Sequence, residues 1–354
     1  MQNINSVEEI MNITVLAGGL SAERDVSLNS GLMCAKSLKA KGHNVFLLDV
    51  YMGTDVKADE AFTTHIDFEK ISASIASSEP DLNKIKEQRG KSDDGFFGKN
   101  VLDICKKSDI VFMALHGANG EDGKIQATFD LLGIKYTGSD YIGSANSMNK
   151  GITRQLLIGN GIQMANGLTC TINEYKNGTL NQWSIFPCVV KPCSGGSSIG
   201  VSIADTKEDF EAAIQESFRY EDEVVVEEFI KGREFSVGIF DGKALPVIEI
   251  ISDGFYDYKN KYSGKTIEVC PAELDNDTTL KMQQAAEKAF ACLKLNIYSR
   301  FDFLLREDGE VFCLESNTLP GMTPTSLIPQ EAAVNGINHA DLCDLIIKKS
   351  LERF

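Results

Sequence analysis

The chain has 354 residues, of which 43% are hydrophobic and 24% charged, a balance typical of a globular protein of two or three domains. No apolar run is long enough to span a bilayer, and residues 1–11 lack the order of a secretion signal, so we expect neither a membrane protein nor a secreted one. The 35 basic and 51 acidic side chains give a formal charge of −16, which argues against nucleic acid or anionic lipid as a partner.

The nine cysteines include no CxxC pair, so they indicate neither a disulfide framework nor a zinc site. Most lie inside apolar runs, where cysteine is expected as a small core residue of a protein in the reducing cytoplasm. The four histidines are scattered, which also argues against a transition-metal site. A magnesium site built from oxygen ligands stays open.

A β-loop-α-β unit opens the chain. Residues 13–17 form a short apolar run that predicts a strand, and a pair of glycines follows as a loop at its carboxyl end. Apolar residues at helical spacing predict a helix over 28–38, and residues 45–50 predict a second strand. Residues 51–108 are polar and weakly periodic, and we expect them to form an insertion with short helices.

A further buried strand is predicted over 109–115, followed by a loop and a helix that carries Ile125, Phe129 and Leu132. Beyond residue 140 helices and hairpins alternate. The predicted fold class is therefore α/β before about residue 140 and α+β after it. The later predicted elements are helices at 151–158, 207–218, 278–293 and from His339, strand pairs at 185–191 with 200–203 and at 223–230 with 234–240, and a loop at 254–271.

The strongest local signal is a hairpin with Asp308-Gly309 as its two-residue turn. Counting outward from this turn places Asp302 opposite Glu315 and Arg300 opposite Asn317. Side chains alternate along a strand, so these four share one face of the ribbon. By the same count that face also carries Leu304, Val311 and Cys313, and the other face carries Phe301, Phe303, Phe312 and Leu314.

Two carboxylates therefore face each other on a ribbon with two largely apolar faces. Opposed like charges repel, and buried charges need a partner. A hard cation held by Asp302, Glu315 and the amide oxygen of Asn317 would supply one, and this ligand set suits magnesium bound to the phosphates of a nucleotide. The alternative is the solvated end of a surface hairpin, in which Arg300 neutralises the acids.

Residues 191–200 form a glycine- and serine-rich segment that could approach a phosphate closely, with Lys191 supplying a positive charge. The segment joins two predicted strands and resembles a flap. The P-loop pattern GxxxxGK[ST] does not occur in the chain. An ordinary glycine-rich turn is the alternative.

Other residues fit a nucleotide site, each with a structural alternative. The segment from Glu227 to Ile230 ends an apolar strand and could pair with an adenine edge, while Glu234 could bind ribose hydroxyls. The same residues could form a polar hairpin tip. Lys150 and Lys261 are isolated lysines that could bind phosphate or simply be solvated.

Two residues of the front half carry a similar ambiguity. Glu23, in the first glycine loop, could hold an amino group or be a carboxylate in the first turn of a helix. His116 could orient a substrate carboxylate or simply end a strand.

Taken together, motifs along the whole chain resemble those of the D-alanine–D-alanine ligase family of the ATP-grasp superfamily. Each motif is weak alone, but the ordered set is highly specific. The motifs are Gly18 to Leu28, His116-Gly117 with Gly120 to Gly123, Tyr136 to Ser139, Ser147 to Lys150, Lys191-Pro192 with Gly196 to Gly200, Tyr256 to Tyr258 with Lys261-Tyr262, Arg300 to Asp302, and Glu315 to Thr323 with Ser326-Leu327.

The resemblance implies an ATP-grasp fold with a Rossmann-like N-terminal domain over 1–139, including the insertion at 51–108. A central domain over 140–226 and a C-terminal domain over 227–354 would hold ATP between them. Two Mg²⁺ or Mn²⁺ ions would be held by Asp302, Glu315 and Asn317, with Glu315 bridging. The implied nucleotide-binding residues are Lys150, Lys191, Ser197, Ser198, Glu227, Glu228, Phe229, Ile230, Glu234 and Lys261.

The resemblance also assigns substrate roles. Glu23 would bind the ammonium group of the first D-alanine and form a hydrogen-bonded trio with Ser197 and Tyr262 that closes the site. Arg300 and the backbone N–H of Gly321 would stabilise the tetrahedral oxyanion. The remaining implied substrate-binding residues are Val26, His116, Ser326 and Leu327, with Ser326 on the carboxylate of the second D-alanine.

The implied function is ATP-dependent ligation of two D-alanines to D-alanyl-D-alanine through an acyl phosphate, for peptidoglycan synthesis, by a cytoplasmic homodimer. D-Alanine–D-serine and D-alanine–D-lactate ligases, or another ATP-grasp amino-acid ligase, are the alternatives. Tyr262 and Leu327 favour the dipeptide product. A non-catalytic nucleotide-binding regulator is disfavoured because Arg300 and the three metal ligands are all present, and a dehydrogenase because GxGxxG is absent.

Three features depart from the family pattern. The stretch 261–271 is about one residue shorter than expected, and Glu268-Val269 stands where an aromatic residue is common. Asn149 replaces the usual aspartate before the lysine. The segment 51–108 matches nothing distinctive.

Overall fold

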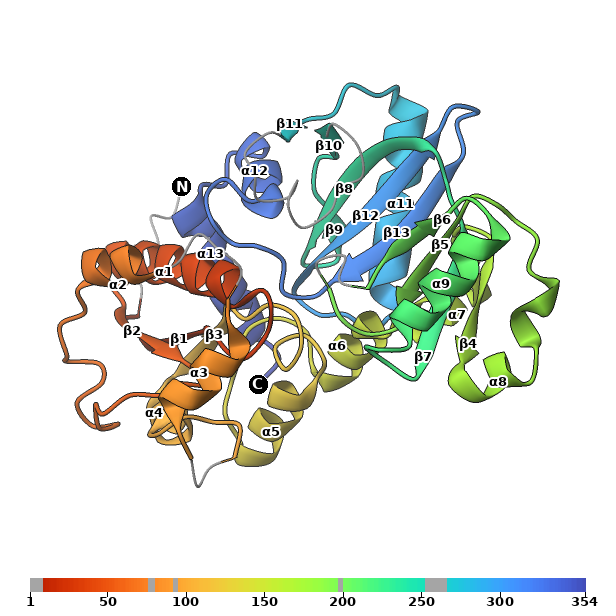
Figure 1. Ribbon diagram of the computed structural model, residues 1–354. Coiled ribbons are helices and arrows are strands. Elements are labelled where there is room, and N and C mark those ends of the chain that lie inside the picture. Colours follow the sequence, from red (N-terminus) through yellow and green to blue (C-terminus); the bar gives the residue numbers. More distant parts are fainter. Residues whose placement is uncertain (1–8, 76–79, 92–94, 197–199, 252–265) are drawn as a thin grey trace.

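The computed structural model describes residues 9–75, 80–91, 95–196, 200–251 and 266–354. The predictions about Ser197, Ser198, Lys261 and Tyr262 lie outside the described residues and stay predictions. The described chain forms three sheets with helices packed around them (Figure 1). Within these ranges, no helix has both the length and the apolar character needed to cross a membrane.

The first sheet is parallel and three-stranded. Its order is β2 (Asn44–Asp49), β1 (Asn12–Ala17) and β3 (Ile110–Met113), with α1 (Arg24–Ala40) connecting β1 to β2. All four residues of β3 are buried, as expected of a parallel strand covered on both faces. The predicted β-loop-α-β unit is therefore confirmed, although its helix begins earlier than predicted, at Arg24.

Residues 51–108 contain short helices, as expected. These are α2 (Phe68–Ser74), α3 (Leu82–Arg89) and α4 (Val101–Lys107). After β3 come α5 (Lys124–Leu132) and α6 (Tyr141–Met148). The predicted helix that carries Ile125, Phe129 and Leu132 is confirmed as α5. Ile125 and Phe129 are buried, whereas Leu132 is 38% exposed at the last position before left-handed Gly133.

The second sheet is antiparallel and follows residue 160. Its order is β4 (Gly167–Thr171), β7 (Glu223–Glu228), β5 (Cys188–Pro192) and β6 (Ser202–Ala204). The predicted pairing of β5 with β6 is confirmed. The accompanying helices are α7 (Lys150–Gly159), α8 (Ile172–Lys176), the 3₁₀ helix η1 (Thr179–Gln182) and α9 (Lys207–Ser217), with Phe210 and Ile214 of α9 packed in the core of this sheet.

The third sheet holds the C-terminal half. Its order is β11 (Ile267–Val269), β10 (Ile248–Ile251), β8 (Gly232–Phe240), β12 (Tyr298–Arg306) and β13 (Val311–Asn317), with β9 (Lys243–Ala244) pairing to β8. The helices of this region are α11 (Asn276–Cys292), α12 (Leu327–Val334) and α13 (His339–Leu351).

Two sequence predictions in this region are wrong. Strands 223–230 and 234–240 do not form a hairpin, because β7 pairs with β4 and β5 while β8 pairs with β10 and β12. Both edges of each strand are thus taken by other strands, and the short connection crosses from one sheet to the next. The predicted loop 254–271 also contains a strand, β11, within its described part.

The C-terminal helix packs against the N-terminal sheet. Leu342, Ile346 and Ile347 of α13 share a buried cluster with Ile13 and Val15 of β1, and α13 lies along α1 (Figure 1). The chain therefore returns to its start after building the third sheet. The division into domains at residues 139 and 226 stays a prediction.

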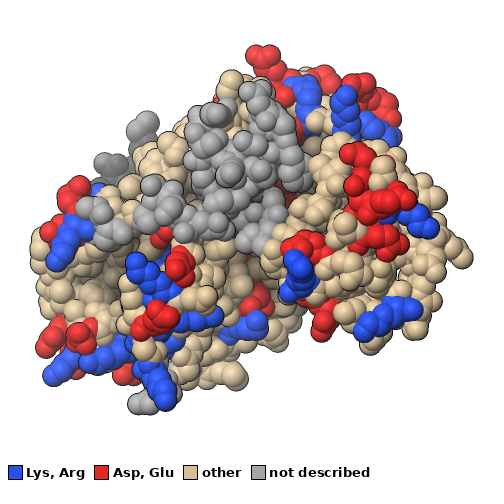
Figure 2. Space-filling view, viewed as in Figure 1, with Lys and Arg blue, Asp and Glu red and all other residues tan. Residues whose placement is uncertain are grey.

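Charged side chains of both signs are interspersed on the face drawn in Figure 2. Acidic side chains gather toward the part of the molecule that holds the second sheet. A basic patch of the kind that attracts a nucleic-acid backbone is not seen among the described residues of this face.

Candidate active site

The β12–β13 ribbon has the predicted pairing where the polar residues lie. Asp302 pairs with Glu315, and Arg300 pairs with Asn317. Asp302 is only 4% exposed. The alternative of a solvated hairpin end is therefore wrong, and two acidic residues do face each other on a largely buried ribbon.

The turn of this ribbon differs from the prediction. The backbone N–H of Arg306 bonds to the carbonyl of Glu310, which leaves a three-residue turn that ends at Gly309 with φ +84°. A β-bulge next to Asp302 offsets this extra residue, because Phe303 pairs with Cys313. Leu314 is the additional residue, so the predicted pairing returns at Glu315.

The same bulge changes the faces near the turn. Val311 and Cys313 pack in one core cluster with Phe301 and Phe303, and not on the Asp302 side as predicted. Phe312 packs with Leu304, Ile230 and Ala165 on the opposite side. Both faces are apolar, as expected, but the assignment of these three residues to faces was wrong.

Asp302 is held by several donors. Nε and Nη2 of Arg300 donate to its two oxygens, both at 2.9 Å, and Ser236 Oγ donates at 2.9 Å from β8. The amide of Asn317 also lies 3.2 Å from Oδ2. Two carboxylates and an amide on adjacent positions offer the oxygen ligands that magnesium prefers. Rotation of the Asn317 amide would turn its oxygen toward such an ion, so the residues fit this group.

A cleft of about 260 Å³ opens beside this ribbon and collects most of the predicted substrate residues. Its lining includes Glu23, Val26, His116, Arg300, Glu315, Asn317, Gly321, Ser326 and Leu327, together with Lys150 and Gly196. These residues come from the N-terminal ends of α1, α7 and α12, from strands β12 and β13, and from the loops that carry His116, Gly196 and Gly321. The fold thus brings together residues that lie far apart along the chain.

Glu23 lies between two glycines of the predicted loops. A Cβ added to Gly117 would be 2.7 Å from its Oε2 atom, and one added to Gly196 would be 3.0 Å away. The carboxylate therefore projects into the cleft where the first glycine loop, the loop after β3 and the glycine-rich segment meet. This position suits a partner for a substrate ammonium group.

His116 is buried and uses both ring nitrogens within the protein. Nδ1 lies 2.6 Å from the carbonyl of Leu319, and Nε2 lies 3.0 Å from Ser30 Oγ, which accepts the N–H of Met322. Burial lowers the pKa of His116, so the neutral ring donates from Nδ1 and accepts at Nε2. His116 thus joins α1 to the segment 319–322 at the cleft wall.

Glu121 was missed as a functional residue. Its Oε1 accepts the N–H groups of Thr318 and Leu319, at 3.0 and 2.8 Å, and its Oε2 accepts the N–H of Gly117 at 2.8 Å. It therefore ties the N-terminal loop to the backbone that directly follows Asn317. Burial raises the pKa of Glu121 to about 7, with Glu23 adding to the rise. Two of its partners, Thr318 and Leu319, lie 197 and 198 residues away, so no local pattern identifies this role.

The predicted second-substrate residues surround a tight turn. Ser326 Oγ accepts the N–H of Thr323 at 3.0 Å, and it would lie 2.9 Å from a Cβ added to Gly321. Leu327 is buried against Ile248 and Ile250. Ser326 and Gly321 are therefore adjacent, above an apolar floor.

The predicted nucleotide residues converge on a second, small cavity. Lys150, Lys191, Glu227 and Glu315 all line it. Lys191 and Glu227 are buried and form an ion pair with each other. Nζ of Lys150 donates to the carbonyl of Gly195 at 2.6 Å, and burial lowers the pKa of Lys150 although Glu315 opposes the change.

Arg154 lines the same cavity and was also missed. Its Nη1 lies 3.6 Å from Glu227 Oε2, and its Nη2 donates to the carbonyl of Ala165 at 2.5 Å. Nη1 is buried without a hydrogen-bond partner in the described structure. An arginine within an amphipathic helix gives no sequence signal for this position.

The other predicted nucleotide residues lie at the crossing between the two antiparallel sheets. Glu228 Oε1 accepts the N–H of Asn166 at 3.1 Å. The N–H of Phe229 donates to the carbonyl of Pro187, the residue before β5, at 3.0 Å. Ile230 is buried, and Glu234 follows on β8 opposite Leu304. Asn149 caps α7 by accepting the N–H of Ile152 at 2.9 Å, so its replacement of aspartate preserves the cap.

Comparison with known proteins gives consistent results along the whole chain. The family model described as D-ala D-ala ligase N-terminus matches residues 12–139, and the one described as D-ala D-ala ligase C-terminus matches residues 157–348. A D-alanine–D-alanine ligase of Pediococcus pentosaceus is 41% identical over 348 residues, which cover 95% of this chain and 97% of the relative. One of Lacticaseibacillus casei is 40% identical over 357 residues, covering 97% of each.

Solved structures agree with these relatives. The D-alanine–D-alanine ligase from Bacillus anthracis complexed with ATP has a TM-score of 0.70 and 30% identity, covering 97% of this chain and 98% of that chain. The VanG D-Ala:D-Ser ligase from Enterococcus faecalis has a TM-score of 0.75 and 26% identity, covering 97% of this chain and 100% of that one. The ATP-grasp fold class predicted from the sequence is thereby confirmed.

Proposed function

The chain belongs to the D-alanine–D-alanine ligase family, and on this basis we propose that it joins two D-alanines to D-alanyl-D-alanine, with conversion of ATP to ADP, for peptidoglycan synthesis. The observation that carries the site assignment is the pairing of Asp302 with Glu315 and of Arg300 with Asn317 at the wall of one cleft. This arrangement gives a metal-binding edge and a guanidinium beside the substrate residues.

A carboxylate is a poor electrophile, so the reaction requires its activation as an acyl phosphate by ATP. Lys150 and Lys191 would offset phosphate charge, and we assign Lys261 to the transferring phosphate. Asp302, Glu315 and Asn317 would hold two Mg²⁺ ions, whose charge favours phosphoryl transfer when they are bound. Glu227, Glu228, Phe229 and Ile230 would hold the adenine, Glu234 the ribose, and Ser197 and Ser198 the phosphates.

Arg300 is suited to stabilise an oxyanion because its position is fixed beforehand. Its bidentate contact with Asp302 and the pairing of β12 with two neighbouring strands hold the guanidinium at the cleft. The N–H of Gly321 would be the second donor. Donors fixed in advance are worth more than donors that must reorganise during the reaction.

Glu23 would bind the ammonium group of the first D-alanine and link with Ser197 and Tyr262 to close the site. Ser326 would orient the carboxylate of the second D-alanine, whose amine attacks the acyl phosphate. His116 would act by positioning the segment that contains Gly321. An acyl phosphate hydrolyses when water reaches it, so the segments 193–200 and 254–271 would cover it.

D-Serine and D-lactate are the alternative second substrates. Leu327, which lines the cleft and packs on Ile248 and Ile250, favours a methyl side chain over a hydroxymethyl group, because a buried hydroxyl needs a hydrogen-bond partner. Tyr262 is the residue that we assign to discrimination against D-lactate. We also propose that the protein is a homodimer and acts in the cytoplasm.

The test is ADP release with D-alanine, D-serine, D-lactate and L-alanine offered singly and in pairs, with the product identified by mass spectrometry. We expect ADP formation with D-alanine alone. The dependence of its rate on the D-alanine concentration should show two binding sites, one for each D-alanine. Absence of D-alanine-dependent ADP release would overturn the proposal. Preference for a mixed pair would identify one of the alternatives. Light scattering after size exclusion tests the dimer.

A further inference from the structure

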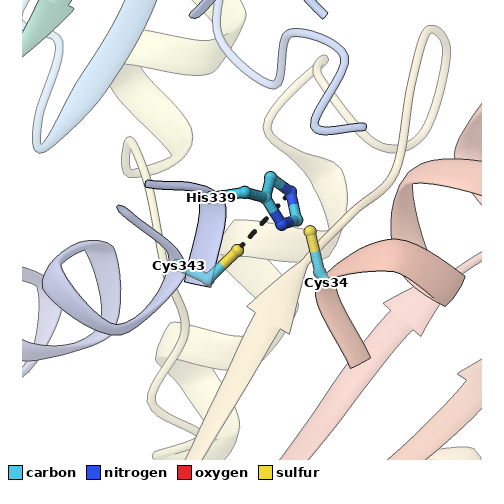
Figure 3. Close-up of side chains that lie close together, drawn as sticks. All are labelled: Cys34, His339 and Cys343. Carbon is cyan, nitrogen blue, oxygen red and sulfur yellow. Dashed lines mark hydrogen bonds between the residues drawn. The ribbon is translucent and has the colours of Figure 1, made fainter. Parts of the chain in front are cut away.

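A cluster of metal-ligating side chains lies where the C-terminal helix meets the N-terminal one. Cys34 of α1 and His339 and Cys343 of α13 place their sulfur and imidazole ligand atoms within 4.8 Å of one another (Figure 3). Both cysteines are fully buried, and His339 is partly exposed at the beginning of its helix. The cluster lies outside the cleft and has no part in the ligase chemistry.

The spacing within α13 sets two of the ligands. His339 and Cys343 are four residues apart, so they share one face of the helix, and their Nε2 and Sγ atoms are 3.9 Å apart. A fourth donor comes from the cleft segment, since the carbonyl of Met322 lies 2.7 Å from Nε2 of His339 and 3.6 Å from Sγ of Cys34.

These separations approach those of a tetrahedral zinc site. Bonds of about 2.3 Å to sulfur and about 2.0–2.1 Å to nitrogen correspond to edges of roughly 3.3–3.8 Å between ligand atoms. The contacts of 3.6 and 3.9 Å are close to this range, and the side-chain ligand atoms all lie within 4.8 Å of one another. The 2.7 Å contact between Nε2 and the Met322 carbonyl is a hydrogen bond, which would lengthen as the ion enters. Small side-chain movements would therefore suffice to bring the donors around one ion.

An outer contact orients the imidazole. Ser37 Oγ lies 2.8 Å from Nδ1 of His339, which leaves Nε2 facing the two sulfurs. Such a contact on the far nitrogen is a common feature of metal-binding histidines. The thiolate is the form of cysteine that binds metal, so both thiols must lose their protons when the ion binds.

We propose that Cys34, His339 and Cys343 form a binding site for a thiophilic divalent cation such as Zn²⁺, with the carbonyl of Met322 as the fourth donor. Binding forms two metal–sulfur bonds and one metal–nitrogen bond. Both thiols give up their protons to solvent. The Nε2–H of His339, which donates to the Met322 carbonyl in the metal-free protein, is lost from Nε2 as the ion binds there, and the neutral ring then carries its proton on Nδ1, where Ser37 Oγ accepts it. The two thiolates balance the charge of the ion, so the buried site is neutral overall.

This proposal departs from the sequence prediction that a transition-metal site is improbable. The ion would join α1, α13 and the segment that contains Gly321, and so it would stabilise the native state against unfolding. A disulfide between the two cysteines is the competing chemistry. It requires an added oxidant, and it would leave the imidazole of His339 and the carbonyl of Met322 hydrogen-bonded to each other.

The test is titration of the reduced, chelator-treated full-length protein with Co²⁺ and then Zn²⁺, with Mg²⁺ in excess to fill the carboxylate site. We expect one equivalent of Co²⁺ with a thiolate-to-cobalt charge-transfer band, which Zn²⁺ removes. Zn²⁺ should also raise the Tm by several degrees. Oxygen ligands give no such band, so binding at Asp302 and Glu315 is distinguishable.

The variants Cys34→Ser, Cys343→Ser and His339→Gln should each lose the band and the Tm shift, whereas Cys292→Ser, which changes a partly exposed cysteine of α11, should keep both. Circular dichroism checks that each variant folds, and a single folded variant is enough to test whether the cluster binds the metal. The proposal is overturned if no stoichiometric band forms, if binding survives the cluster variants, or if peroxide yields a Cys34–Cys343 disulfide in protein that binds no metal.

Discussion

Asp302 faces Glu315 across the β12–β13 ribbon, and its carboxylate receives both donors of the Arg300 guanidinium, at 2.9 Å each. Asp302 therefore has two roles. It fixes the orientation of Arg300, and together with Glu315 it offers carboxylate oxygens to a cation. This dual role makes the ribbon sensitive to the removal of a single negative charge.

Glu315→Gln is expected to lower kcat by about 10³-fold or more, because the neutral amide is a weak ligand for magnesium and leaves phosphate charge uncompensated. The free energy of unfolding should change little. Steady-state kinetics over a range of Mg²⁺ concentrations measures the effect. Glu310→Gln, in the turn of the same hairpin, is the control and should retain full activity. A Glu315→Gln enzyme with normal turnover would disprove the bridging role.

Gly117→Ala is expected to raise the KM for D-alanine about tenfold or more, since its new methyl group would lie 2.7 Å from Glu23 Oε2 and displace the carboxylate. Gly117 also has φ +70°, so alanine costs about 1–2 kcal/mol of stability there. Gly133→Ala is the matched control, with φ +68° and no atom within 4 Å of the added carbon.

Kinetics and chemical denaturation together separate the two effects. Both glycine variants should lose similar stability, but only Gly117→Ala should lose D-alanine affinity. Equal kinetic effects in the two variants would mean that Glu23 does not bind the substrate.

Arg154→Met is expected to raise the KM for ATP about tenfold while leaving the KM for D-alanine nearly unchanged. Arg154 flanks Glu227 opposite Lys191, so its loss releases one side of the carboxylate that we assign to the adenine. Arg219→Met removes an exposed arginine of the surface pair with Glu216 and should leave both constants unchanged. A change in the KM for D-alanine without a change in the KM for ATP would contradict the assignment.

Glu331 is fully buried on α12, where it accepts the N–H of Gly238 at 2.7 Å. Burial raises the pKa of Glu331 well above its ordinary value, so the native state keeps a proton that the unfolded chain releases. The free energy of unfolding should therefore fall as the pH rises above the ordinary glutamate pKa, by up to about 1.4 kcal/mol per pH unit, until the native carboxyl also ionises.

Glu331→Gln keeps the acceptor oxygen and has no proton to lose. Its stability relative to wild type should consequently increase between about pH 6 and about pH 8 in urea denaturation. Glu310→Gln, an acid in the β12–β13 turn, controls for general charge effects. If the difference between wild type and Glu331→Gln does not change with pH, the buried carboxyl is ionised in the native state.

Much of the candidate site follows from local chemistry in the sequence. The hairpin signal and the alternation of side chains were enough to pair Asp302 with Glu315. The prediction succeeded there although the turn has three residues, because the bulge at Leu314 restores the pairing. Sequence patterns do not reveal such paired irregularities, and for that reason the faces of Val311, Phe312 and Cys313 were predicted wrongly.

The remaining failures concern contacts between distant parts of the chain. Both β7 and β8 are good strands with a short connection, and only the competition of other strands for their edges separates them. Glu121 and Arg154 acquire their roles from backbone groups of other segments. Local propensity carries no information about these partners.

The packing of α13 into the core around β1 has a consequence for synthesis of the protein. The first sheet leaves the ribosome early, but the residues that cover it, Leu342, Ile346 and Ile347, are translated only after the strands of all three sheets. Part of the apolar surface of the nascent N-terminal domain therefore stays uncovered until then, and a premature stop codon before α13 would leave a chain that chaperones hold and proteases degrade.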